Sequence, residues 1–376
     1  MIIKNGILFC DDGIFRKADL ETRDGVIAAI GTVDGGYDVF DTKDRYVVPG
    51  FVDIHIHGCA GADFCDGDAE AIETMARFLA TVGTTSFLGT SMALSEDMLA
   101  DIFTVAQPLV GQYTSGSAVM RGIYMEGPFF NQEKRGAQNE KYIINPDFDM
   151  FSRLFDAAGG HINTIAMAPE LPGGLDFIKH ARAMTRVSVA HSNATYDAAK
   201  AAFDAGALNV THLFNGMSPF AHRDPGIVGA AADANATVEL ICDGYHLHPA
   251  AVRAVFALFG ADKVCLISDA MRACGMPDGS YELGGQKVIV GDGTANLENG
   301  SLAGSVATLH DCFCNAVRFG IPVEIALKAA TINPARAMGL DMAVGSLMRG
   351  KQADLLILDR EYNLEKVMIN GEWVKM

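Results

Sequence analysis

The chain has 376 residues, of which 49% are hydrophobic, and its formal net charge is −17 at pH 7. This length exceeds what one compact core usually needs, so we expect one large domain with a smaller one beside it. The acidic balance argues against a nucleic-acid-binding protein, which should present a basic face. It does not exclude a small anionic ligand, because a single arginine in a pocket can hold a phosphate.

The start of the chain lacks the charged and apolar regions of a signal peptide, and no apolar run is long enough to cross a bilayer. The eight cysteines include no Cys-x-x-Cys pair. We therefore expect a cytoplasmic protein with reduced thiols and no membrane partner.

Short strands punctuated by Gly and Asp clusters are predicted at both ends of the chain. They cover residues 2–9, 18–22 and 26–30 near the N-terminus, and 354–359, 364–369 and 371–374 near the C-terminus. Different patterns fill the region between them. We therefore expect both ends to form one small β-sandwich domain, from residues 1–49 and 345–376.

Between the two ends, short apolar runs alternate with helical stretches. The predicted strands cover residues 51–57, 84–90, 120–126, 163–168, 186–191, 208–212, 238–243 and 264–269. The predicted helices cover residues 70–81, 96–108, 147–158, 175–183, 196–205, 249–259 and 307–319. Eight apolar strands joined by helical crossovers predict an α/β fold, a parallel (β/α)8 TIM barrel, over residues 50–344. A glycine-rich stretch at 291–304 predicts a hairpin loop followed by a turn.

The first predicted barrel strand ends in two histidines, His55 and His57. Side chains at positions i and i+2 of a strand point to the same face, so both imidazoles can aim at one point. A metal site requires this arrangement. One such pair only suggests a metal site, and residues at the ends of later strands provide the further support.

Later predicted strands end in further histidines and carboxylates. Glu126 ends the third strand, His191 the fifth, His212 the sixth and Asp269 the eighth. Because catalytic groups of a (β/α)8 barrel lie at the carboxyl ends of its strands, we expect these side chains to ring one mouth. Imidazole and carboxylate ligands together suit Zn²⁺ or Fe²⁺, so the sequence predicts a divalent-metal site.

Several motifs resemble those of the amidohydrolase superfamily and, within it, of the N-acetylglucosamine-6-phosphate deacetylases. Residues 48–57 and 350–359 resemble the flanking signatures of the superfamily. The motifs that resemble those of the deacetylases lie at 125–129, 190–195, 211–217, 223–226, 243–246 and 302–305. The resemblance runs nearly end to end, and it implies a barrel of the metal-dependent hydrolase type.

By that resemblance, Glu126, His191 and His212 hold the main metal ion, and Asp269 is the catalytic general acid/base. Arg223 is the implied main ligand of a substrate phosphate. The other implied substrate contacts are Ala137, Asn215, Gly216, His246, Leu302, Ala303 and Gly304.

The chain departs from parts of the family at two places. Some members carry Gln and Asn in place of His55 and His57 and bind one metal ion. Both histidines are present here, so the resemblance implies a second ion bridged by Glu126, and thus one or two ions per subunit. Some members carry a His where this chain has Gln138, so the resemblance assigns that position no role.

The implied reaction is metal-dependent hydrolysis of the acetamido group of N-acetyl-D-glucosamine 6-phosphate in amino-sugar catabolism or recycling. The implied partner is this small phosphorylated amino sugar, and the implied assembly is a homodimer. The sequence leaves open the galacto epimer as substrate, and another amidase activity of the superfamily. Other amidohydrolases often use a modified lysine on the fourth strand, and residues 163–168 contain none. A non-catalytic scaffold should lose ligands, whereas every expected ligand is present.

Overall fold

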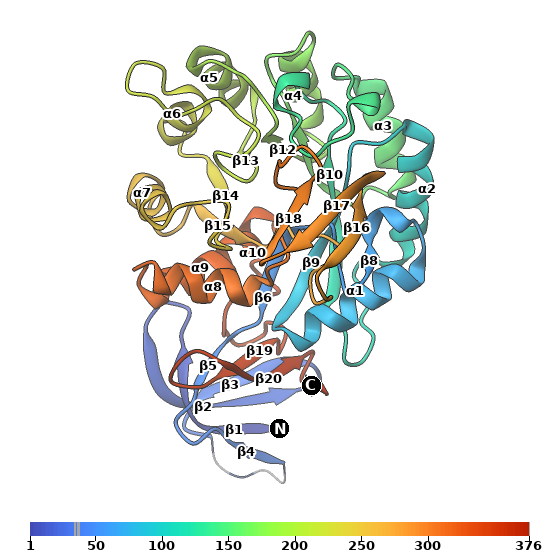
Figure 1. Cartoon of the computed structure of the whole chain (residues 1–376). Helices are drawn as coiled ribbons and strands as arrows, with labels where there is room; N and C mark the ends of the chain where they lie inside the picture. The colour runs from blue at the N-terminus through green and yellow to red at the C-terminus, as the bar shows by residue number, and fades with distance from the viewer. Residues whose placement is uncertain (34, 36–37, 376) are drawn as a thin grey trace.

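The computed structural model describes residues 1–33, 35 and 38–375. Its largest part is a barrel of eight parallel strands that follow one another in chain order (Figure 1). These strands are β6 (Phe51–Ile56), β9 (Thr84–Ser91), β10 (Val119–Glu126), β11 (Ile162–Met167), β12 (Arg186–Val189), β13 (Asn209–Val210), β14 (Thr237–Ile241) and β15 (Val264–Ile267). The predicted (β/α)8 fold is confirmed.

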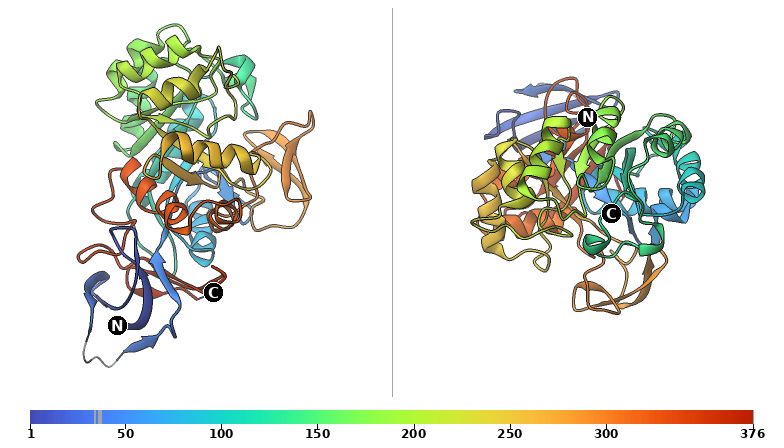
Figure 2. Two further views of the ribbon diagram at one scale, coloured as in Figure 1. Left: turned by 90° about the vertical axis from the view of Figure 1, so that its left-hand side faces the viewer. Right: turned by 90° about the horizontal axis from the view of Figure 1, so that it is seen from above.

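Helices surround the barrel on its outside (Figures 1 and 2). They are α1 (Ala69–Thr81), α2 (Glu96–Ala106), α3 (Phe148–Ala157), α4 (Gly174–Ala181), α5 (Tyr196–Ala205), α6 (Gly226–Asp233), α7 (Pro249–Phe259), α8 (Leu309–Arg318), α9 (Val323–Ala330) and α10 (Ile332–Ala337). Every residue of β6, β9, β14 and β15 is buried, because helices cover one face of the sheet and barrel side chains fill the other.

Polar side chains fix where several of these helices begin. A side-chain oxygen of the residue before the helix accepts a hydrogen bond from a first-turn N–H group, which has no partner within the helix. The residues that do so at α1, α2, α3, α5 and α8 are Asp68, Ser95, Asp147, Thr195 and Thr308. The start of each of these five helices is therefore determined by a residue directly before it in the sequence. The sequence prediction missed α6, α9 and α10.

Strands from both chain ends form a second sheet, at the bottom of Figure 1. Its strands are β1 (Ile2–Phe9), β2 (Phe15–Arg23), β3 (Val26–Gly31), β4 (Val39–Asp41), β5 (Tyr46–Pro49), β19 (Leu355–Leu358), β20 (Leu364–Ile369) and β21 (Glu372–Trp373). Strand β5 joins the two halves, because it pairs with β1 on one side and with β19 on the other. Leu20 and Ile27 share a buried cluster with Ile357 and Met368, so the sheet curls around its own core. The division into domains after residues 49 and 344 stays a prediction.

A small sheet projects from the barrel after β15 (Figure 2). It contains β16 (Gly279–Leu283), β17 (Gln286–Gly291) and β18 (Thr294–Leu297). The predicted hairpin is confirmed at Asp292-Gly293, where both residues have left-handed backbone, as a two-residue turn requires. Strand β16 was not predicted. A second short hairpin, β7 (Gly58–Cys59) and β8 (Ala62–Asp63), comes after β6.

Two further features concern the cysteine thiols and the helices. The eight cysteines are free thiols, and five of them are buried. Within the part of the chain that the structure describes, no helix combines the length and apolar character that spanning a bilayer needs.

Candidate active site

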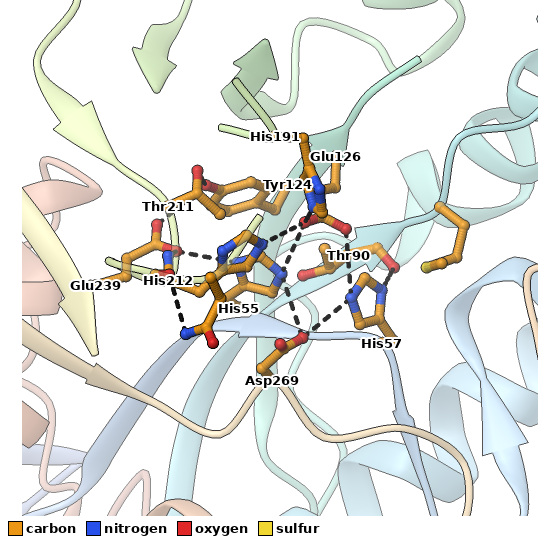
Figure 3. Close-up of polar contacts among 12 residues, drawn as sticks. His55, His57, Thr90, Tyr124, Glu126, His191, Thr211, His212, Glu239 and Asp269 are labelled. Atoms are coloured by element: carbon orange, nitrogen blue, oxygen red, sulfur yellow. Dashed lines mark hydrogen bonds and ion pairs between the residues drawn. The ribbon is translucent and has the colours of Figure 1, made fainter. Parts of the chain in front are cut away.

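The predicted ligands gather at the carboxyl ends of the barrel strands (Figure 3). His55 lies in β6 and Glu126 ends β10, whereas His191, His212 and Asp269 lie two residues beyond the ends of β12, β13 and β15. These last three have left-handed backbone, with φ of +43°, +25° and +48°. Such backbone is costly for residues other than glycine and tends to cluster at functional sites. Here it accompanies side chains that point toward one another across the mouth of the barrel.

Two groups of side chains share the carboxylate of Glu126. Nε2 of His191 lies 3.2 Å from Oε1 of Glu126, and Nε2 of His212 lies 3.0 Å from the same oxygen. On the other side, Nε2 of His57 lies 3.5 Å from Oε2, and Nε2 of His55 lies 3.8 Å from Oε1. Within each group the ligand atoms lie within 4.8 Å of one another, and all are buried. Imidazole nitrogens around a carboxylate are donors that divalent metals prefer, so both groups fit a metal ion.

Asp269 adjoins His55 in β6 and His57 directly after it. Its Oδ1 lies 3.2 Å from Nε2 of His57 and 3.6 Å from Nε2 of His55. The side chain is nearly buried, yet it lines the same cavity as Glu126. A carboxylate in this place can accept a proton from a molecule bound between the two groups.

The buried charges compensate one another. Burial alone would raise the pKa of Glu126, but hydrogen bonds from His191 and His212 hold it well below its ordinary value. Burial would also raise the pKa of Asp269, but the hydrogen bond from His57 and the charge of His55 lower it. Both carboxylates are therefore ionised at neutral pH, as a metal ligand and a general base must be.

A backbone carbonyl fixes the imidazole of His191. Its Nδ1 lies 2.8 Å from the carbonyl oxygen of Lys134. An Nδ1–H that donates to this carbonyl leaves Nε2 as the nitrogen that faces Glu126, and its lone pair becomes available to a metal ion once its proton is lost. Gly216, at φ +61°, makes room for this contact. A Cβ there would lie 2.8 Å from Nδ1 of His191 and 3.1 Å from the Lys134 oxygen.

The imidazole of His57 is held in the same way, with Nδ1 3.3 Å from the carbonyl oxygen of Thr90. Burial would lower the pKa of His57, but Asp269 and Glu126 raise it to about 9. Nε2 of His55 is buried and has no hydrogen-bond partner among the described residues. This nitrogen is therefore free to bind a cation.

A cavity of about 280 Å³ opens over these groups. Six of the predicted substrate contacts line it, namely Ala137, Asn215, Gly216, His246, Leu302 and Gly304. Ala303 is fully buried and does not line the cavity. Arg223 is exposed on the loop before α6 and also lies outside the lining. The structure thus brings most of the predicted contacts to the ligand groups but leaves Arg223 on the surface.

His246 enters the cavity in a fixed orientation. Its Nδ1 lies 2.7 Å from Oδ2 of Asp243, whose other oxygen accepts the backbone N–H of His246 at 2.9 Å. Burial would raise the pKa of Asp243, but these contacts with His246 lower it. The second ring nitrogen of His246 is left to meet a ligand.

Sequence reasoning missed two side chains that contact the candidate metal ligands. Gln138 donates from Nε2 to Oε2 of Glu126 at 2.5 Å, while its own Oε1 accepts the backbone N–H of Ala93 at 2.8 Å. Glu239 lies in the middle of β14, with Oε2 3.0 Å from Nδ1 of His55. A lone carboxylate inside an apolar strand was the signal that could have revealed Glu239. Gln138 carried no signal beyond its departure from the family pattern.

The sequence profile of the amidohydrolase family matches residues 46–374. The chain belongs to the amidohydrolase family. Within the family, this amidohydrolase is 37% identical over 379 residues to the N-acetylglucosamine-6-phosphate deacetylase of Lysinibacillus sphaericus. The alignment covers 99% of this chain and 97% of the relative.

Two further comparisons concern the sugar named for each similar deacetylase. The N-acetylgalactosamine-6-phosphate deacetylase of Escherichia coli O157:H7 is 34% identical over 370 residues, or 97% of each chain. A solved structure of N-acetyl-D-glucosamine-6-phosphate deacetylase from Mycobacterium smegmatis, an aspartate-to-alanine mutant in complex with N-acetyl-D-glucosamine-6-phosphate, superimposes with a TM-score of 0.92 at 32% identity. The superposition covers 100% of this chain and 99% of the chain from Mycobacterium smegmatis. This amidohydrolase is thus similar over its length to deacetylases of both epimers.

Proposed function

We propose that this amidohydrolase hydrolyses the acetamido group of N-acetyl-D-glucosamine 6-phosphate, giving D-glucosamine 6-phosphate and acetate. The observation that carries the proposal is the convergence on one cavity of Asp269 and four of the five candidate metal ligands, His57, Glu126, His191 and His212, with the fifth, His55, buried beside them. The similar deacetylases supply the substrate class. The role would be in amino-sugar catabolism or recycling.

The residues present would hold one or two divalent ions. Glu126, His191 and His212 would hold the first, and His55 and His57 would share Glu126 to hold the second. The mixture of imidazole and carboxylate donors favours Zn²⁺ or Fe²⁺. When bound, such an ion lowers the pKa of a water molecule and polarises an amide carbonyl.

Asp269 would move the proton that the reaction requires. Its ionised Oδ1 accepts a proton from the attacking water, whose oxygen forms a bond with the acyl carbon. The carbon–nitrogen bond then breaks, and Asp269 returns the proton to the leaving sugar nitrogen. Because water is the nucleophile, no side chain needs to form a covalent intermediate.

The cavity lining would orient the sugar phosphate. Ala137, Asn215, Gly216 and the turn at 302–304 surround the ligand groups, and His246 presents a ring nitrogen held in place by Asp243. Arg223 would grip the phosphate with its guanidinium. Because Arg223 is exposed, it would have to approach the mouth of the cavity from outside.

A second candidate substrate is N-acetyl-D-galactosamine 6-phosphate, because a deacetylase named for that epimer is 34% identical to this chain. The two sugars differ at one hydroxyl group. The deciding experiment measures acetate release from both phosphorylated epimers, with metal content determined on the same sample. A higher kcat/KM on the gluco epimer supports the first proposal, and a higher kcat/KM on the galacto epimer supports the second. Metal-loaded protein that releases acetate from neither contradicts both.

We also propose that the protein is a cytoplasmic homodimer. The free thiols support a reducing compartment. The dimer rests on the resemblance alone, and light scattering of the purified chain tests it.

A further inference from the structure

Glu239 lies in the barrel interior beside the metal-ligand groups (Figure 3). Both oxygens of its fully buried carboxylate have partners. Oε2 lies 3.0 Å from Nδ1 of His55 and accepts the backbone N–H of His212 at 3.4 Å. Oε1 accepts the hydroxyl of Tyr124 at 3.0 Å. Glu239 therefore contacts the imidazole ring of His55 and the backbone of His212. Its side chain does not line the cavity.

The contact with His55 differs from those of the other ligand imidazoles. Nδ1 of His57 and Nδ1 of His191 face backbone carbonyls. Nδ1 of His212 has no partner within the described residues. Only His55, of these four, has Nδ1 against a carboxylate. A carboxylate in this position fixes the tautomer and orientation of an imidazole and makes its other nitrogen a stronger metal donor.

A chain of hydroxyl groups supports Glu239 from the opposite side. The hydroxyl of Tyr124 lies 2.7 Å from Oγ1 of Thr211, which in turn lies 2.7 Å from Oγ of Ser188. These side chains come from β10, from β12 and from the residue after β13, and they carry no charge. They satisfy the polar atoms around Oε1 and hold the carboxylate against His55.

The charge of Glu239 needs compensation nearby. Among the residues that the structure describes, no lysine or arginine lies within 4 Å of its carboxylate, and its one ion-pair partner is His55. Beyond His55, Nε2 faces Glu126 and Asp269, which are also anionic. A buried carboxylate is costly without a positive charge. A cation bound at Nε2 of His55 would add to the positive charge that the histidines already place beside these carboxylates.

We propose that Glu239 is a positioning residue, which holds His55 as a ligand of the second metal ion and so sets whether this site binds two ions or one. The inference deepens the proposed function and rests on it for its bearing on catalysis. Its test needs no substrate, so it is separate from the test of the reaction.

The test is the binding of Zn²⁺ to the metal-stripped full chain, measured in competition with a chromophoric chelator. Glu239→Gln keeps the size of the side chain and an oxygen that can face His55, but it removes the charge. Loss of such an outer partner typically weakens metal binding by about 10–100-fold. We expect two Zn²⁺ equivalents on the parent protein, and weakening by about this factor of one equivalent alone on the variant.

Asp53→Asn is a matched control, because Asp53 is a buried carboxylate on the same strand as His55. Its Oδ1 accepts backbone N–H groups of His55 and Ser268, each at 3.3 Å, and an amide oxygen can do the same. Both Zn²⁺ affinities should match those of the parent. Glu239→Leu removes the acceptor entirely and should leave one equivalent.

Unchanged binding of both equivalents to Glu239→Gln overturns the proposal, as does equal weakening of both or a parent that binds only one. If Glu239→Leu fails to fold, Glu239→Gln decides alone. A parent that binds two Zn²⁺ ions but releases no acetate contradicts the proposed function and leaves the role of Glu239 standing.

Discussion

Replacing Asp269 with Asn separates proton transfer from the structural contributions of this residue. Its backbone, at φ +48°, donates its N–H to the carbonyl of His55 at 3.0 Å and accepts the N–H of Ser305 at 2.7 Å. Asn has the same size and tolerates left-handed backbone, so these contacts stay. The amide oxygen can still accept a hydrogen bond from His57. It cannot take a proton from water.

The expected effect is confined to turnover. A positioned general acid/base contributes about 10²–10⁴ in rate, which corresponds to about 3–5 kcal/mol of activation free energy. We expect kcat for acetate release from N-acetyl-D-glucosamine 6-phosphate to fall by this factor, with KM and metal content unchanged. Near-parental kcat at full metal content would refute the reasoning. Asp262→Asn is the control, because Lys328, at 3.3 Å, is the one ion-pair partner of this exposed residue among the described residues, and such pairs contribute little.

Three further substitutions test the ligands and the substrate contacts. His55→Gln should remove one metal ion at most by elemental analysis, because Glu126, His191 and His212 remain, and complete loss would make the first-strand pair the principal site. Arg223→Ala should raise KM for the phosphorylated sugar about tenfold or more by removing a charged hydrogen bond. An equal loss on the unphosphorylated sugar would exclude phosphate recognition. Gly216→Ala adds a methyl group 2.8 Å from Nδ1 of His191 at φ +61°. The free energy of unfolding should fall by about 1–2 kcal/mol, and a parental Tm together with parental metal affinity would contradict the close contact.

The barrel strands could be predicted because both of their faces are buried, which makes their sequences continuous apolar runs. The prediction of 84–90 lies within β9, Thr84–Ser91. Helix α6, Gly226–Asp233, was missed for a related reason. Its residues are almost all small or apolar, so no polar face reveals a helical period. The Pro225 and Gly226 at its start suggested a loop instead.

The convergence of the candidate ligand residues could be predicted because strand ends in a barrel meet whatever their separation along the chain. Contacts that depend on three-dimensional packing could not be. The side chain of Gln138 reaches Glu126 from a loop whose course has no sequence signature. Arg223 lies within a dozen residues of His212 in the sequence, yet the loop that carries it stays exposed. Nearness along the chain does not bring a loop side chain to a cavity.

The proposed acid/base and the first pair of ligands lie where the barrel closes, between β15 and β6. There the N–H of Asp269 donates to His55 at 3.0 Å, and the N–H of His57 donates to Ala270 at 2.9 Å. The residues that would carry the chemistry therefore also make the backbone hydrogen bonds that join the two ends of the sheet. Their relative positions are set by backbone, which holds reacting groups more precisely than long side chains can. A change confined to the Asp269 side chain leaves this junction intact. A Cβ at Gly304, which would lie 2.9 Å from the Asp269 carbonyl oxygen, would instead displace the acid/base relative to the ligands.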